Sequence, residues 1–353
     1  MKGIRALLLL AALLPVPAYS FVFDEIFAFG DSLSDNGNTF AATAAAQPSP
    51  IPIIPPSPPY FEGRFSNGPV AVEYLASLRG AALHDMAWGG ATTGIGNTND
   101  GGTVSSFGLL NLPGVATQIA NFSASLPSIE ANDLFVLWAG PNDFLAGNFS
   151  DPAAAVNTGV TNLAGSLATL ATLGAAHVLV PNMADLSLTP SARAQAAALS
   201  GTGGPASGAL FLQSLRALSI AFNAGLASAL ETLEAAFPAT AFIPADVFAT
   251  FNAAVADPAA FGFTNVTDRC LSVDLMSVCA SPQAFLFWDG IHPTTQAHGV
   301  LAGLFNTALN AALPEPSTLL LLAIGFGALV WVRRQANRSQ AQLQPPNPES
   351  GSL

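Results

Sequence analysis

Five short apolar runs recur along the chain, and alanine- and leucine-rich stretches with helical spacing lie between them. Glycine, proline or polar residues follow each run, as they do where strands end in turns. The expected strands are Ile26–Phe29, Leu83–Trp88, Leu134–Trp138, His177–Val180 and Ala241–Ile243. Apolar strands that alternate with helices indicate a parallel sheet covered on both faces. The pattern therefore predicts an α/β fold with ligands bound at the carboxyl ends of its strands.

Two segments interrupt the alternation. The proline-rich segment Gln47–Tyr60 cannot form a helix or a central strand, because proline lacks the backbone N–H. It lies between the first strand and the helix that follows, so we expect an ordered loop over the ligand site. The glycine- and serine-rich segment Ser200–Gly208 is expected to be a flexible surface loop between two helices.

Both ends of the chain differ from globular sequence. Residues 1–20 combine two basic residues, an apolar run and small residues, which is the pattern of a secretory signal peptide. Near the other end, residues 318–332 are apolar and two arginines follow them. This run of 15 residues is shorter than the roughly 20 that an upright helix needs to cross a bilayer. We expect it to attach the chain to a membrane, at least transiently, with the arginines on the cytoplasmic side.

The part between these ends, residues 21–313, is strongly acidic. It holds five arginines and no lysine, against 20 aspartates and glutamates, which is a net charge of −15. Such a charge repels phosphate backbones, so nucleic acid is excluded as a partner. The acidic residues are dispersed, as on an ordinary anionic surface.

The two cysteines, Cys270 and Cys279, are nine positions apart. Two cysteines alone cannot form a structural zinc site. In a secreted chain we expect one disulfide, which stabilises by about 2–3 kcal/mol in the chain-entropy model. Two free buried thiols are the alternative.

One serine has the surroundings of a nucleophile. Ser32 directly follows Gly-Asp at the end of the first expected strand. Its hydroxyl needs a base to become reactive, and His292 has Asp289 three residues before it. A carboxylate so placed can fix the imidazole tautomer and stabilise the imidazolium. His84 and His177 lie at or beside expected strands and are expected to be structural, and His298 lies within the last expected helix.

Two further strand ends offer donors for a developing oxyanion. The run Gly89–Thr92 lacks bulky side chains, so a backbone N–H can approach a substrate there. The run Gly140–Asp143 contributes the side-chain amide of Asn142. Each run alone is typical of a turn, but together with Ser32 they place complementary groups at one edge of the sheet.

Five motifs in order, FGDSLSDNGN, AWGGATTG, WAGPNDF, HVLVPNMADLSLTP and FWDGIHPT, resemble the GDSL esterases and lipases of the SGNH hydrolase superfamily. The resemblance implies a flavodoxin-like three-layer α/β/α sandwich with a five-stranded parallel sheet in the order 2-1-3-4-5. It also implies a catalytic triad of Ser32, Asp289 and His292, with oxyanion donors from Ser32, Gly90 and Asn142. The implied domain covers residues 21–313, and no cofactor or metal is expected.

The chain departs from the family pattern at two positions. Asp85 stands where the second motif usually opens with asparagine, and Ala184 stands where proline is common. Asp85 lies five residues before Gly90, so we expect it to affect the support of that motif rather than the donors. Neither change removes a catalytic role.

The C-terminal stretch PEPSTLLLLAIGFGALVWVRR resembles a PEP-CTERM sorting signal over residues 314–336, with a polar tail over 337–353. That resemblance implies recognition by an exosortase-type membrane enzyme and cleavage near Pro-Glu-Pro. We therefore expect an exported protein that is periplasmic, cell-surface or extracellular.

The expected function is hydrolysis of a carboxylic ester through an acyl-enzyme, with a lipid or simple acyl ester as substrate. Deacetylation of an exopolysaccharide and acyl transfer to an alcohol are alternatives within the same chemistry. A surface interaction protein without activity is the alternative from another class, and the complete Ser32, Asp289 and His292 set argues against it.

Overall fold

The structure is a computed structural model, which describes residues 21–125, 128–145, 151–313 and 324–334. The chain separates into two units, and the larger one, Val22–Ala312, is called the body below. The body contains the whole sheet and its own hydrophobic core, so it has what a domain needs to fold by itself.

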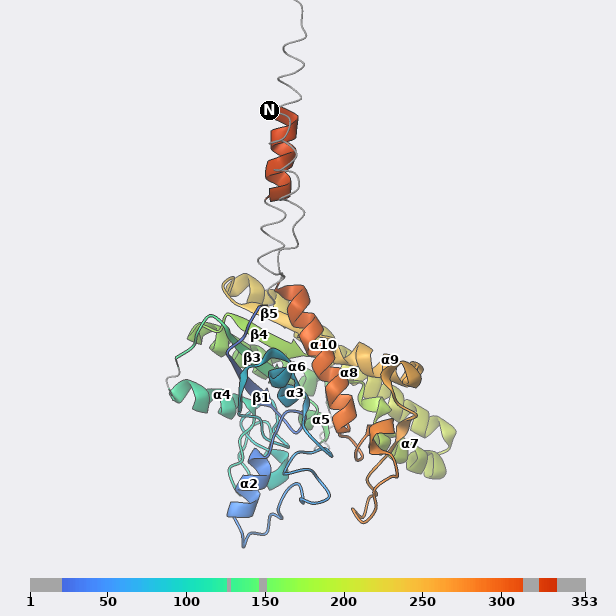
Figure 1. The fold of residues 1–353 in the computed structure, drawn as a ribbon. Helices are drawn as coiled ribbons and strands as arrows, with labels where there is room; N and C mark the ends of the chain where they lie inside the picture. The colour runs from blue at the N-terminus through green and yellow to red at the C-terminus, as the bar shows by residue number, and fades with distance from the viewer. Residues whose placement is uncertain (1–20, 126–127, 146–150, 314–323, 335–353) are drawn as a thin grey trace, which may run out of the picture. The chain divides into compact units, whose positions relative to one another are not determined.

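A five-stranded sheet forms the centre of the body, and each strand pairs in parallel with its neighbours. Its order is β2-β1-β3-β4-β5, which confirms the predicted 2-1-3-4-5 arrangement (Figure 1). The strands are β1 (Glu25–Gly30), β2 (Ala82–Asp85), β3 (Asp133–Trp138), β4 (His177–Pro181) and β5 (Ala241–Ala245). The prediction for the second strand was too long, because Met86 and Trp88 bond to β1 only through their N–H groups and no ladder continues.

Helices cover both faces of the sheet (Figure 1). On one side α10 packs against α3, β4 and β5, and on the other α4 contacts β1, α6 packs on α4 and α8, and α8 contacts β5. The helices are α2 (Asn38–Ala45), α3 (Ala71–Arg79), α4 (Val115–Ala124), α5 (Asn142–Leu145), α6 (Pro152–Leu173), α7 (Pro190–Gly203), α8 (Pro205–Ala236), α9 (Val247–Ala256) and α10 (Thr295–Ala312).

The three inner strands, β1, β3 and β4, are mainly apolar on both faces, as a sheet between two helical layers requires, whereas no residue of the edge strand β2 is fully buried. Phe27, Phe29 and Phe135 are buried on the side of α4, α6 and α8. Trp138 points to the opposite side, where its ring meets Phe305 of α10 at 5.5 Å between centroids. Each strand therefore ends between two packed layers, and the backbone at its carboxyl end is held firmly.

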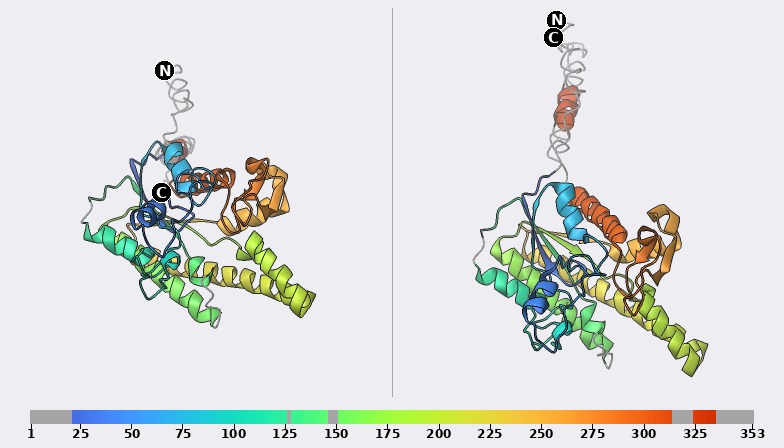
Figure 2. Two further views of the ribbon diagram at one scale, coloured as in Figure 1. Left: turned by 90° about the horizontal axis from the view of Figure 1, so that it is seen from below. Right: turned by 60° about the horizontal axis from the view of Figure 1, so that its bottom comes forward.

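The segment Ser200–Gly208 is mostly helical, so the prediction of a flexible loop was wrong. Helix α7 continues to Gly203, only Gly204 separates it from α8, and Pro205 occupies the first turn of α8. Proline is favoured there because the first-turn N–H has no partner within the helix. In Figures 1 and 2 the α7–α8 pair extends well beyond the sheet.

The proline-rich segment Gln47–Tyr60 contains no helix or strand, as expected. It follows α2, and its last residue, Tyr60, packs against a small cluster around Cys270 and Trp288. That cluster lies directly after the ends of a two-stranded parallel sheet of β6 (Asn265–Arg269) and β7 (Phe285–Phe287), which the pattern did not predict. Between its strands, Cys270 and Cys279 form a disulfide.

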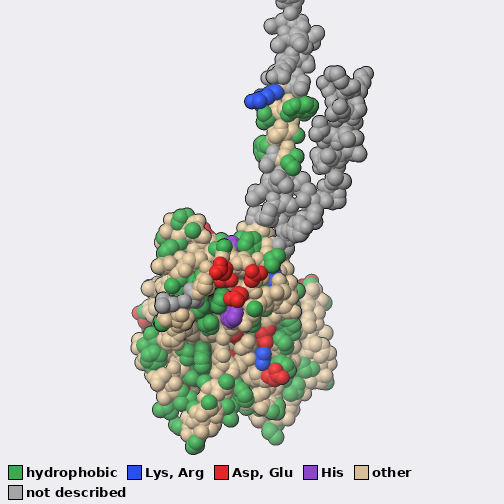
Figure 3. Space-filling view, turned by 60° about the vertical axis from the view of Figure 1, so that its left-hand side comes forward, with side chains coloured by type: hydrophobic (Ala, Val, Ile, Leu, Met, Phe, Trp, Pro, Cys, Tyr) green, Lys and Arg blue, Asp and Glu red, His purple; other side chains and the backbone are tan. Residues whose placement is uncertain are grey.

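The surface of the body matches its acidic composition. On the face in Figure 3, acidic side chains gather in one area, and most of the remaining surface is apolar or uncharged. Among the described residues, α8 is the one helix long and apolar enough to span a membrane by length and composition. Within the body α8 buries Phe222, Leu226 and Leu230 in the core, as the central helix of a globular domain does.

The smaller unit holds the two ends of the chain. Within it the structure describes a helix over residues 324–334. The expected signal peptide, residues 1–20, and the polar tail, 337–353, lie outside the described residues. The expected membrane segment, 318–332, is described only from residue 324 onward.

Candidate active site

Ser32 lies in a tight turn at the carboxyl end of β1. Its neighbour Gly30 has a φ of +156°, and a Cβ there would lie 2.2 Å from the carbonyl oxygen of Trp138, so only glycine fits. Buried Gln118 of α4 bonds both the N–H and the carbonyl of Gly30, at 3.0 and 2.8 Å. The Leu33 N–H donates to the Asp31 carboxylate at 3.0 Å, which stabilises the turn. The strand end thus presents the Ser32 hydroxyl at a fixed position.

His292 and Asp289 lie in the loop between β7 and α10. One Asp289 oxygen, Oδ1, accepts the backbone N–H groups of Ile291 and His292 at 2.9 and 2.7 Å. Trp288 N–H donates to the His292 carbonyl at 2.8 Å and closes the loop. This local hydrogen bonding explains why Asp-x-x-His can hold its two side chains against each other.

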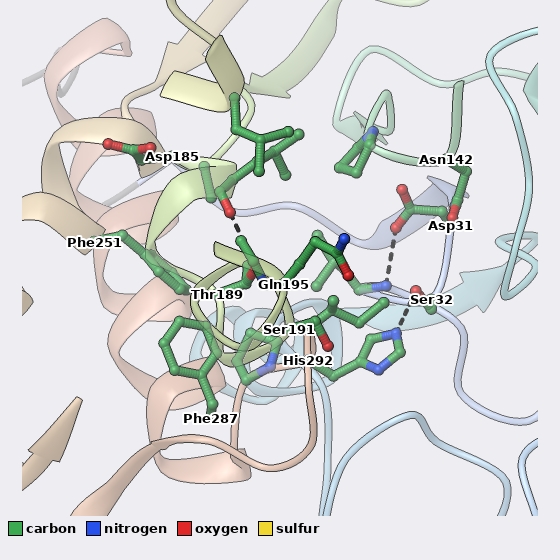
Figure 4. A pocket seen from close by; sticks show the side chains of 18 of the residues that line it. Asp31, Ser32, Asn142, Asp185, Thr189, Ser191, Gln195, Phe251, Phe287 and His292 are labelled. Carbon is green, nitrogen blue, oxygen red and sulfur yellow. Dashed lines mark hydrogen bonds between the residues drawn. The ribbon is translucent and has the colours of Figure 1, made fainter. Parts of the chain in front are cut away.

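The three side chains form a continuous chain of hydrogen bonds. The second Asp289 oxygen, Oδ2, lies 2.7 Å from Nδ1 of His292. Nε2 of His292 lies 2.8 Å from Oγ of Ser32 (Figure 4). A carboxylate accepts only, so Nδ1 carries the proton and Nε2 is left to accept from the Ser32 hydroxyl. The geometry allows His292 to take a proton from Ser32.

The Asp289 carboxyl stays ionised at every ordinary pH. Burial by itself would raise its pKa, but the charge of His292 and the hydrogen bonds from His292, Ile291 and Tyr60 lower the pKa to about 2. A permanent negative charge beside Nδ1 stabilises the imidazolium that forms when His292 takes a proton.

Tyr60 is a site residue that the sequence did not reveal. Its hydroxyl donates to Oδ2 of Asp289 at 2.7 Å, the same oxygen that His292 contacts. Burial and the nearby Asp289 charge raise the pKa of Tyr60, so the phenol remains a neutral donor. Its place at the end of the proline-rich loop was the only available signal, and the two residues are 229 positions apart.

The backbone around Gly90 is held by polar side chains from several elements. Gly90 has a φ of +79°, and a Cβ there would lie 2.5 Å from Oδ1 of Asn97. The preceding Gly89 donates its N–H to Asp35 at 2.7 Å, and its carbonyl accepts from Asn97 and Asn99 at 2.8 Å each. These contacts fix the direction of the Gly90 N–H before any ligand arrives.

Asn142 begins the short helix α5 and lines the cavity beside Ser32 (Figure 4). Its Nδ2 donates to the Ala91 carbonyl at 3.0 Å, and this hydrogen bond joins the AWGGATTG motif to the WAGPNDF motif. The adjacent Asp143 accepts from both the N–H and the hydroxyl of Thr93, at 2.8 and 2.6 Å. An amide nitrogen has two hydrogens, so Asn142 can bond Ala91 and also face a ligand.

Several buried acids surround these donors. Burial raises the pKa of Asp31 to about 7 and that of Asp143 to about 6. Burial and the Asp35 charge raise the pKa of Asp85 well above its usual value. Asp85 accepts from the N–H groups of Asn36 and Ala87 at 2.8 and 2.9 Å, so this departure from the family pattern supports the turn after Ser32.

None of the other three histidines lines the cavity beside Ser32. His298 is buried in α10, where its Nδ1 accepts the Ala71 N–H at 3.2 Å at the start of α3. Burial lowers the pKa of His298 to about 3, so it serves as a neutral acceptor. In the described part of the chain, no three His, Cys, Asp or Glu residues come together as a metal site would require.

A mostly apolar cavity of about 310 Å³ opens beside Ser32 and His292. Figure 4 shows these two residues and Asn142 near one end, and Phe251 and Phe287 near the other. Its apolar walls come from strand ends and the segments after them, from the α7–α8 pair and from α9: Leu33, Trp138, Pro141, Ala184, Leu186, Ala192, Phe211, Leu215, Phe251, Phe287, Ile291 and Pro293. Such a lining with few polar groups is typical of a pocket for an apolar ligand.

A parallel sheet that presents a hydrogen-bonded Ser–His–Asp chain above an apolar cavity has the architecture of a serine hydrolase. The family model described as GDSL-like Lipase/Acylhydrolase matches residues 26–305. The chain belongs to this family, as its motifs indicated. The PEP-CTERM protein-sorting motif matches residues 312–334, which confirms the second resemblance.

Individual relatives agree with the family assignment. Over 176 residues the chain is 35% identical to a phosphatidylcholine-sterol acyltransferase of Aeromonas hydrophila, covering 49% of this chain and 48% of that protein. It is 29% identical to a thermolabile hemolysin of Vibrio parahaemolyticus, covering 79% and 62%. A GDSL esterase/lipase of Arabidopsis thaliana is 26% identical, covering 78% and 83%. The chain thus spans only about half to three fifths of the first two relatives.

Solved structures with a similar fold include hydrolases. The chain resembles LAE5, an alpha/beta hydrolase from the metagenome of Lake Arreo, with 13% identity, a TM-score of 0.44 and coverage of 84% and 98%. It also resembles Axe2, an acetylxylan esterase from Geobacillus stearothermophilus, with 12% identity, a TM-score of 0.41 and coverage of 82% and 96%.

Proposed function

We propose that the protein hydrolyses carboxylic esters through an acyl-enzyme on Ser32. Oγ of Ser32 attacks the ester carbonyl while Nε2 of His292 takes its proton, and Asp289 stabilises the resulting imidazolium. The imidazolium then protonates the leaving alcohol as the carbon–oxygen bond breaks. Water repeats these steps on the acyl-enzyme, releasing the acid and restoring Ser32. The observation that carries the proposal is the hydrogen-bond chain of 2.7 and 2.8 Å at the mouth of the cavity.

The tetrahedral oxyanion is assigned to three donors: the N–H groups of Ser32 and Gly90 and the side-chain amide of Asn142. The preorganised turn at Gly89 and the Asn142–Ala91 hydrogen bond support this assignment, because donors fixed before the reaction need no reorganisation during it. A donor of this kind contributes roughly 10²–10³-fold to kcat.

The proposed substrate class is a lipid or simple acyl ester. The apolar cavity supports this choice, because an acyl chain bound along it would replace water against aromatic and aliphatic walls. Deacetylation of an exopolysaccharide would need only a small acyl pocket beside Ser32. Acyl transfer to an alcohol uses the same acyl-enzyme, and the acyltransferase among the relatives keeps it as the second candidate.

A chain-length series tests the substrate class. We expect kcat/KM of the body to rise from acetyl to medium-chain esters of one alcohol. Ala192 of α7 is buried at the cavity wall, so Ala192→Leu should lower kcat/KM for medium-chain esters about tenfold and leave acetyl esters nearly unchanged. The matched control is Ala194→Leu, which places the same side chain at an exposed position of α7. Activity on acetyl esters alone would instead assign the enzyme to carbohydrate deacetylation.

We also propose export and C-terminal processing. The pattern of residues 1–20 and the matched sorting motif support removal of a signal peptide, temporary membrane attachment through residues 318–332 and cleavage near Pro314-Glu315-Pro316. Mass spectrometry of the native surface protein tests this proposal. We expect the mature chain to begin near residue 21 and to end near residue 314. A mature surface protein that retains Leu353 would rule out the processing.

A further inference from the structure

The hairpin closed by the disulfide exposes large apolar side chains in an unusual way. Four of them project from its turn: Val273, Leu275, Met276 and Val278, called the apolar tip below. Val273 and Met276 are 78% and 84% exposed, more than any other large apolar residue described in the body. Scattered exposed apolar residues need no explanation, but four within six consecutive positions form a patch that marks an interaction surface.

The turn that carries the tip is well ordered by its own hydrogen bonds. Ser272 N–H donates to the Ser277 carbonyl at 2.9 Å, and Cys279 N–H donates to the Cys270 carbonyl at 2.8 Å. The Ser272 hydroxyl accepts from Ser277 N–H at 3.0 Å and donates to the Asp274 carboxylate at 2.6 Å. Because these polar groups are paired within the hairpin, moving the tip into an apolar environment leaves few of them unsatisfied.

The base of the hairpin is joined to the loop between β7 and α10, which holds Asp289 and His292 and is called the catalytic loop below. Leu271 N–H donates to the Trp288 carbonyl at 2.7 Å, and Trp288 directly precedes Asp289. The ring of Tyr60, which donates to Asp289, meets the Trp288 ring at 6.3 Å between centroids. In Figure 1 the orange hairpin projects from the lower edge of the body, together with the blue proline-rich loop. The tip therefore protrudes on the side of the molecule where the carboxyl strand ends lie.

We infer that the apolar tip inserts into the surface of a lipid aggregate with neutral, zwitterionic headgroups. This inference builds on the proposed lipid-ester activity. The body has a net charge of −15, and the tip itself carries Asp274, so an anionic surface would repel it. Insertion would hold the catalytic edge against the lipid and let an acyl chain enter the cavity without crossing water.

Binding is tested on the isolated body, residues 21–313, with Ser32→Ala so that no lipid is consumed. We expect it to float with phosphatidylcholine vesicles and at least fivefold less with vesicles that contain phosphatidylglycerol. Replacing Val273 and Met276 together with serine should weaken phosphatidylcholine binding at least tenfold. The matched control replaces Leu78 and Ile220 with serine, two exposed apolar residues of α3 and α8, and should bind as before.

The catalytically active body, with Ser32 retained, separates this inference from the proposed function. Its tip variant should hydrolyse a soluble short-chain ester at the unchanged rate but phosphatidylcholine vesicles at least tenfold more slowly. If the active body without tip substitutions hydrolyses neither ester, the proposed function is rejected. Vesicle binding by the Ser32→Ala body would still support insertion of the apolar tip into lipid. Equal vesicle binding by the parent and the tip variant would overturn the inference. A dimer in ultracentrifugation that the tip substitutions dissociate, without vesicle binding, would assign the tip to a protein interface instead.

Discussion

Replacing Ser32 with alanine is expected to reduce ester hydrolysis about 10⁶-fold, because loss of the nucleophile removes the acyl-enzyme route entirely. The residual rate would come from the oxyanion donors and substrate binding alone. The measurement is kcat for a soluble short-chain ester with the purified body. Thermal unfolding should be nearly unchanged, since Ser32 gives up one hydrogen bond to His292 and leaves no packed space of consequence.

Ser34 provides a matched control two positions away. It is fully buried, and among the described residues its hydroxyl has no hydrogen-bond partner. Ser34→Ala therefore removes the same atoms from the same turn and should leave kcat within about twofold. Activity that survives Ser32→Ala, or that Ser34→Ala abolishes equally, would contradict the assignment of the nucleophile.

Replacing Asp289 with asparagine should lower kcat about 10⁴-fold while the loop stays folded. The amide cannot stabilise an imidazolium, and it can present an N–H to Nδ1 of His292 and so favour the wrong tautomer. It would also meet the Tyr60 hydroxyl, which donates to Asp289 in the native site. The measurement is kcat for the soluble short-chain ester between pH 5 and 9. Because the pKa of Asp289 is about 2, the native carboxylate remains ionised throughout this range.

Tyr60→Phe gives the comparison for that experiment. It removes one of the four hydrogen bonds to the Asp289 carboxylate and keeps the ring that packs on Trp288. We expect kcat to fall no more than about tenfold, with KM unchanged, because the remaining donors still orient the carboxylate. A loss for Asp289→Asn as small as that for Tyr60→Phe would show that the carboxylate charge is not required.

The sheet could be predicted from the sequence because its signal is local. The inner strands β1, β3 and β4 contain continuous apolar runs that end in glycine, proline or polar residues, as buried parallel strands do in any fold. Strand ends were less certain. Residues 86–88 continue the apolar pattern of β2 but bond to β1 by single N–H groups. The α7–α8 junction was misjudged because Gly201 and Gly203 read as a loop, although both lie on the exposed side of a helix that packs against its neighbour.

In the candidate site, too, some residues could be predicted from local sequence and others could not. Ser32, Gly90 and Asn142 follow predicted strand ends, and the rule that parallel strands end at one edge brings them together. The Asp289–His292 pair was found from its own spacing, and it follows β7, a strand outside the predicted sheet. Tyr60 and the cavity residues of α7 and α8 do not follow that rule. Tyr60 reaches Asp289 only through the path of a proline-rich loop, and Ala192 and Phe211 meet the cavity through the packing of α7 and α8. Contacts between residues so far apart along the chain leave no pattern of hydrophobic and polar positions in a single sequence.

The disulfide between Cys270 and Cys279 has a practical consequence for producing the enzyme. It closes the hairpin whose base bonds to Trp288, next to the carboxylate that orients His292. A preparation from a reducing bacterial cytoplasm would contain two thiols beside that loop, and its batches would differ in specific activity according to how far they had oxidised. Recombinant expression should therefore direct the body to the periplasm, and titration of free thiols should accompany every kinetic measurement.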